Sequence, residues 1–97
     1  MYAIAIVRYR KPLEEVLTHV DAHRAYLRDL KSKGVLVASG PLEPRYGGAL
    51  LLRVPDQGGD AVLLGVRDGD PFFKAGVAQY ELLPWLPNIG KDDLDKA

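Results

Sequence analysis

The sequence predicts an α+β fold in the order βαββαβ, a split βαβ pattern with a four-stranded antiparallel sheet and two helices. Two features of the 97 residues carry this prediction. Short runs of aliphatic, β-branched and aromatic residues recur along the chain, as strands require. Between the first two runs, apolar residues repeat every three or four positions, which is typical of an amphipathic helix.

Residues 2–9 are the first expected strand, and most of its side chains are apolar. Because side chains alternate along a strand, Ile4 and Ile6 share one face of the sheet. The opposite face carries Ala3, Ala5, Val7 and Tyr9. The strand therefore has apolar side chains on both faces.

An amphipathic helix is expected between Pro12 and Gly34. Proline suits the first turn of a helix, and glycine suits the position just after its end. The apolar positions that repeat at helical spacing are Leu13, Val16, Leu17, Val20, Leu27 and Leu30.

The middle of the chain predicts a hairpin followed by a second helix. Residues 35–42 and 47–54 read as two strands joined by the turn EPRYGG. Residues 56–69 fit either a buried strand or a helix with Ala61 and Leu64 on one side. We expect a helix, because it completes the βαββαβ order.

The last strand is expected at residues 77–85. The segment after it is polar and reads as a loose tail or a short helix. We therefore expect one domain over residues 1–86 and a tail over residues 87–97.

The composition excludes several classes of function. Thirteen basic residues balance thirteen acidic ones and form no long cluster, so nucleic acid is not an expected partner. The absence of cysteine excludes thiol nucleophiles, disulfides and thiolate metal sites. The sequence shows neither a secretory leader nor the run of about 20 apolar residues that a membrane span needs. We expect a cytoplasmic protein without a membrane partner or a cofactor.

The sheet is expected to have two apolar faces, and two helices cover only one of them. The third strand places Leu50 and Leu52 on one face and Ala49 and Leu51 on the other. A second copy of the chain is the simplest cover, which predicts a homodimer with its sheets packed face to face about a two-fold axis. Alternatively, small side chains such as Ala49 leave a face that tolerates solvent.

One edge of the first helix carries three polar aromatic side chains. At 100° per residue, with Val20 at the centre of the apolar face, His23 lies inside that face at about −60°. His19 and Tyr26 lie just outside it, at about −100° and −120°. This rim is a candidate pocket wall, where an imidazole needs a partner that fixes its tautomer. A packed histidine with a structural hydrogen bond explains the same position.

Asp70 and Pro71 predict a capped helical turn that closes at Gly76. Aspartate is a favoured N-cap, and proline is a favoured first helical residue. Capping occupies one carboxylate oxygen and leaves the other free for a histidine. A structural role and a functional role for Asp70 are therefore compatible.

The segments HRAYLRDLKSKGVLVASGPL and DGDPFFKAGVAQYELLPW together resemble the YCII-related family of small bacterial proteins. The shared features are a histidine on the first helix followed by a hydrophobic pair, a glycine that stops this helix, and a strand that ends in Gly-Pro. An Asp-Pro-aromatic turn then leads through Ala-Gly to the last strand. The likeness covers residues 2–85. In one departure, Val20 stands where family members often carry an arginine, and Arg24 lies about 40° away around the helix but one turn later.

The resemblance implies a ferredoxin-like α+β subunit that pairs into a dimeric barrel. It also implies a His–Asp dyad at His23 and Asp70. A substrate cleft would be lined by the strand end, at Ser39, Gly40 and Pro41. Tyr26, Phe72 and Tyr9 are expected to add an aromatic wall to this cleft, and ordinary core packing explains the same residues.

A histidine and a carboxylate without a cysteine or serine nucleophile suit proton transfer better than acyl transfer. We therefore expect a lyase or isomerase that acts on a small substrate, and the resemblance to enzymes that act on ring compounds implies that a cyclic substrate is one candidate. Metal binding by His19, His23 and Asp70 is a weaker hypothesis, because the spacing of the two histidines is common. A ligand carrier without turnover and a structural dimerisation module remain alternatives.

Overall fold

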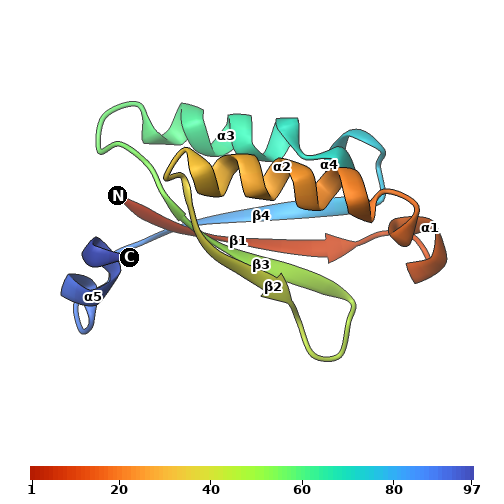
Figure 1. Cartoon of the computed structure of the whole chain (residues 1–97), viewed down its shortest axis with the longest axis horizontal. Coiled ribbons are helices and arrows are strands. Elements are labelled where there is room, and N and C mark those ends of the chain that lie inside the picture. The colour runs from red at the N-terminus through yellow and green to blue at the C-terminus, as the bar shows by residue number, and fades with distance from the viewer.

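The computed structural model describes residues 1–97 and contains one antiparallel sheet in the order β2-β3-β1-β4. The strands are β1 (Tyr2–Tyr9), β2 (Leu36–Pro41), β3 (Gly47–Arg53) and β4 (Ala78–Trp85). The helices are α1 (Leu13–Leu17), α2 (Val20–Ser32), α3 (Gly59–Gly69), α4 (Pro71–Lys74) and α5 (Lys91–Lys96). Helices α2, α3 and α4 lie on one face of the sheet (Figure 1). The predicted ferredoxin-like fold, with a four-stranded antiparallel sheet, is confirmed.

The strand register separates a covered face from an open face of the sheet. On the helix side, Leu50 pairs with Ala5, which in turn pairs with Leu82. Leu50 and Ala5 are buried and belong to the core beneath the helices. One residue along each strand, Leu51, Ile4 and Leu83 form a row on the face without helices. Both faces therefore carry apolar side chains, as the sequence predicts.

The single helix expected between Pro12 and Gly34 is wrong, because the chain breaks at Thr18 and His19. The Thr18 hydroxyl donates to the Glu15 carbonyl at 2.7 Å, and the backbone of His19 (φ −108°, ψ 3°) is not helical. The break turns α1 away from the direction of α2. His23 consequently lies in the first turn of α2 rather than in the middle of a long helix.

The segment 56–69 does contain a helix, but its expected face is wrong. The buried positions of α3 are Gly59, Leu63 and Val66. Ala61 and Leu64 point to solvent. The four glycines of this segment weaken the apolar period, so the sequence alone does not determine which side of the helix is buried.

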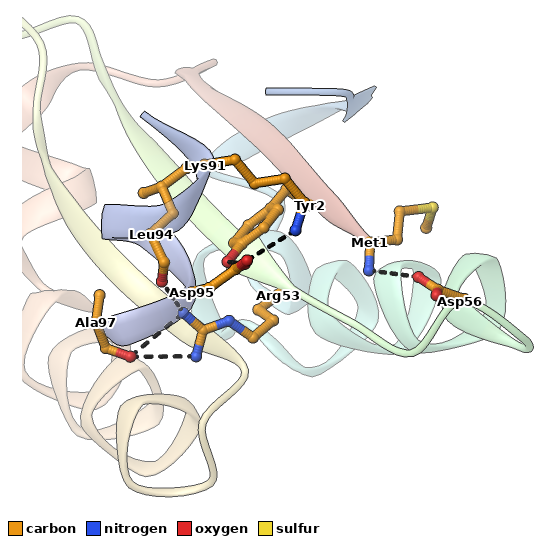
Figure 2. Close-up of polar contacts among 8 residues, drawn as sticks. All are labelled: Met1, Tyr2, Arg53, Asp56, Lys91, Leu94, Asp95 and Ala97. Carbon is orange, nitrogen blue, oxygen red and sulfur yellow. Dashed lines mark hydrogen bonds and ion pairs between the residues drawn. The ribbon is translucent and has the colours of Figure 1, made fainter. Parts of the chain in front are cut away.

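The polar C-terminal segment forms α5, which packs near the start of β1 (Figure 2). The Tyr2 hydroxyl donates to the Asp95 carboxylate at 2.7 Å, and the Arg53 guanidinium donates to the carbonyl oxygens of Leu94 and Ala97. Lys91 forms an ion pair with Asp95, with Nζ and Oδ2 2.7 Å apart. The tail is thus a short helix attached to the sheet.

None of the helices combines the length and the apolar character needed to cross a membrane.

Candidate active site

Asp70 begins the short helix α4 and is fully buried. Its Oδ1 accepts a hydrogen bond from the backbone N–H of Phe72 at 2.9 Å, and Pro71 occupies the first helical position. The turn ends before Gly76, whose φ of +71° suits a residue without a side chain. The predicted N-cap is confirmed, and it holds the carboxylate in one place.

His23 contacts this carboxylate from helix α2. Its Nδ1 lies 2.8 Å from Asp70 Oδ1, although the two residues are 47 positions apart in the sequence. The imidazole also stacks on the Phe72 ring, with ring centroids 3.8 Å apart. The predicted contact between His23 and Asp70 is therefore present in the structure, and a catalytic role for it stays a prediction.

Tyr80, which no sequence motif indicates, completes the surroundings of the carboxylate. Its hydroxyl donates to Asp70 Oδ2 from strand β4. Burial and the neighbouring Asp70 charge raise the pKa of Tyr80 far above its ordinary value. The phenol therefore keeps its proton and stays a hydrogen-bond donor. The available signal was the strand alternation, which puts Tyr80 on the helix side with Ala78 and Leu82.

The hydrogen bonds around Asp70 determine which nitrogen of His23 is free. An ionised carboxylate only accepts hydrogen bonds, so Nδ1 of His23 carries the proton that bonds to it. Nε2 then has a free lone pair. Nε2 has no hydrogen-bond partner in the chain, and no buried side-chain nitrogen or oxygen lacks one, so solvent reaches Nε2.

His23 lines a cavity of about 220 Å³ between α2 and the β2–β3 hairpin. The start of α2, α4 and the β2–β3 loop all lie at the same end of the sheet (Figure 1). The predicted residues Ser39, Gly40, Pro41 and Phe72 line the same cavity. An apolar cavity of about 150 Å³ holds a benzene molecule, so this one is large enough for a small single-ring compound.

The YCII-related domain family matches residues 1–86, which is most of the chain. The chain belongs to the YCII-related family. The resemblance noted in the sequence is thereby confirmed. No sequence among the curated proteins matches the chain.

A solved structure similar to this YCII domain is that of 5-chloro-2-hydroxyhydroquinone dehydrochlorinase (TftG) from Burkholderia phenoliruptrix AC1100, in complex with 2,5-dihydroxybenzoquinone. The two chains superpose with a TM-score of 0.76 over 91% of this chain and 96% of that chain. Their sequences are 21% identical, so the comparison shows a shared fold.

Tyr26 does not line the cavity of this YCII domain, contrary to the sequence prediction. Its hydroxyl donates to the Val66 carbonyl of α3 at 2.8 Å, and its ring packs against Gly69. Tyr26 lies at the edge of the apolar face of α2 and is partly buried against the core. That side of α2, however, faces α3, so the phenol joins the two helices.

Ser39 and His19 lie near His23 but form no side-chain hydrogen bond with it. Ser39 lines the cavity, but no hydrogen bond joins its hydroxyl to His23. His19 is the N-cap residue of α2, and its carbonyl accepts from the His23 N–H at 3.0 Å. No group of three or more histidine, aspartate or glutamate side chains is arranged to hold a metal ion.

Proposed function

We propose that this YCII-related protein is a lyase or isomerase that moves a proton on a small, single-ring substrate. The observation that carries the proposal is the contact of His23 Nδ1 with Asp70 Oδ1 at 2.8 Å, in a histidine that lines a cavity and whose Nε2 has no partner in the chain. Nε2 would act as a general base, and Asp70 would orient the ring and stabilise the imidazolium that forms.

The proposed reaction classes follow from the absence of a nucleophilic side chain bonded to His23. No cysteine occurs in the chain, and the Ser39 hydroxyl is not bonded to His23. The base would therefore take a proton from a C–H or O–H group of the substrate rather than activate a nucleophile. In an elimination, the released electron pair forms a double bond and expels a leaving group. In an isomerisation, His23 returns the same proton to another atom of the substrate.

The neighbour TftG supports this choice by analogy. It is a dehydrochlorinase that was solved with a quinone, and elimination of hydrogen chloride from a ring needs a base. The analogy concerns the fold and not the substrate, because function depends on the residues of the site.

The proposal is tested with two assays on the wild type and on His23→Asn. One measures chloride release from 5-chloro-2-hydroxyhydroquinone, and the other measures deuterium uptake from D2O by a panel of single-ring phenols and ketones. We expect the wild type to accelerate at least one of these reactions and His23→Asn to lose about 10²–10⁴-fold in rate. Circular dichroism and the melting temperature report whether the variant stays folded.

Each other result favours a different role. Ligand binding by the wild type without any turnover indicates a carrier. A His23→Asn variant with full activity, or one whose only defect is a lower melting temperature, indicates that the pair with Asp70 is structural.

We also propose that the protein is a homodimer paired through the open sheet face. Ala38, Leu51, Ile4 and Leu83 form a row across the strands β2, β3, β1 and β4 on this face. None of the four is buried in the single chain, and Leu83 is 41% exposed. Contiguous exposed apolar surfaces are uncommon on monomers, and a second sheet would cover this one.

A further inference from the structure

The cavity beside His23 carries positive charge and no acidic side chain. Arg24 and Arg45 line it, and its other lining residues include no lysine, aspartate or glutamate. Arg24 comes from helix α2, and Arg45 comes from the loop between β2 and β3. The two arginines therefore reach the cavity from two separate elements.

Neither guanidinium has a partner within the chain. The ion pairs and side-chain hydrogen bonds of the structure involve other arginines, such as Arg8 with Glu81 and Arg67 with Asp68. Asp21 and Glu43, the acids closest to Arg24 and Arg45 in sequence, form no ion pair with them. Other exposed cations are also unpaired, but Arg24 and Arg45 are distinguished by lining one cavity.

The helix explains why Arg24 faces the same space as the base. Val20, His23, Arg24 and Leu27 follow the i, i+3, i+4, i+7 spacing of a single helix face, and all four line the cavity. Because His23 and Arg24 line the same cavity, a ligand held by the Arg24 guanidinium would share that cavity with the imidazole. The apolar part of the same ligand would rest on side chains such as Val7 and Leu50.

We propose that Arg24 and Arg45 form an anion-binding site, so that the ligand of this cavity is a small organic carboxylate with an apolar ring. A carboxylate matches the planar, multi-donor guanidinium and can accept from two of its N–H groups. The inference rests on the proposed function, because it names the substrate class of the same cavity. A neutral ring of the same size would leave both charges without a partner.

The test is an NMR titration of the ¹⁵N-labelled protein with benzoate and with its neutral analogue benzamide. Benzoate is expected to shift the resonances of His23 and of its cavity neighbours, and benzamide is expected to bind at least about tenfold more weakly. Arg24→Gln and Arg45→Gln should each weaken benzoate binding about tenfold, as for the loss of one charge-assisted hydrogen bond. Neither variant should change the affinity for benzamide.

Arg28→Gln is the matched control, because Arg28 is exposed on the same helix but does not line the cavity. This variant makes the same change of charge and should bind benzoate like the wild type. An equal loss in all three variants would show that only the net charge matters. Equal binding of benzoate and benzamide, or no shift of cavity resonances by about 10 mM benzoate, would also overturn the proposal.

The titration separates this inference from the proposed catalysis. His23→Asn removes the base and keeps both arginines, so it should still bind benzoate in preference to benzamide. Loss of turnover with retained benzoate binding supports both proposals. Retained turnover in His23→Asn refutes the catalytic role of His23 and leaves the anion site standing.

Discussion

The imidazole of His23 lies flat on the ring of Phe72, with the two centroids 3.8 Å apart and the two planes inclined by 5°. The backbone N–H of Phe72 donates to the same carboxylate oxygen that receives His23 Nδ1. The turn that begins at Asp70 therefore contacts the imidazole twice, at its edge through the carboxylate and at its face through the phenyl ring. The orientation of the candidate base is set by this turn.

Replacement of Asp70 by alanine should destabilise the protein strongly. The change removes a buried acceptor and leaves His23 Nδ1, the Phe72 N–H and the Tyr80 hydroxyl without their partner. We expect the free energy of unfolding to fall by about 3 kcal/mol in urea denaturation. Asp68→Ala is the control, since Asp68 is exposed and pairs only with Arg67, and it should change stability by less than about 0.5 kcal/mol. Similar effects of the two substitutions would contradict the importance of the buried carboxylate.

The contribution of Tyr80 to stability should disappear at alkaline pH. The pKa of Tyr80 is raised in the folded protein above its ordinary value, which is about 10. A group with a raised pKa contributes its full stability below the unfolded pKa and loses it as the pH rises through the folded one. The stability difference between the wild type and Tyr80→Phe should therefore be constant up to about pH 9 and shrink by about pH 11. Denaturation curves of both proteins across this pH range test this prediction. A constant difference would show that the stability contribution of Tyr80 does not depend on the protonation of its hydroxyl.

Two glycines of helix α3 should respond oppositely to alanine. A Cβ at Gly69 would lie 2.6 Å from the Tyr26 hydroxyl oxygen, so Gly69→Ala should displace that ring and cost about 1–3 kcal/mol. Nothing lies within 4 Å of a Cβ at Gly65, and Gly65→Ala should stabilise the helix by about 0.5–1 kcal/mol. Thermal unfolding measures both effects. A stabilising Gly69→Ala would mean that Tyr26 does not pack against the end of α3 as described.

The open sheet face should control the oligomeric state. Leu83→Glu places a charge in the apolar row on this face and should convert a dimer into a monomer at micromolar concentration, as measured by sedimentation. Leu64→Glu is the control, because Leu64 is 46% exposed against 41% for Leu83, but lies on helix α3 away from this face. A wild type that sediments as a monomer, or a Leu83→Glu variant that remains a dimer, would remove the face-to-face pairing.

The sequence predicted the features that depend on local patterns. The alternation in β1 and β3 indicated two apolar sheet faces, and the pair Asp70-Pro71 indicated the capped turn. These signals are reliable because each depends on a few adjacent residues with strong backbone preferences.

The features that the sequence did not predict depend on contacts between distant segments. The break at His19 interrupts a pattern whose apolar spacing would also suit an unbroken helix, and it leaves Leu13 and Leu17 exposed. The Tyr26 ring faces α3, because Gly69 has no side chain and leaves room for the ring. The bond from Tyr80 to Asp70 and the approach of Arg45 to the cavity likewise require the positions of separate elements.

The tautomer of the neutral His23 ring tests the central claim most directly. Long-range ¹H–¹⁵N correlation spectra distinguish a protonated from an unprotonated ring nitrogen. The structure predicts a proton on Nδ1, bonded to Asp70, and a bare Nε2 at the cavity. A ring protonated on Nε2 instead would mean that this nitrogen cannot accept a proton from a substrate, and the proposed general base would be ruled out.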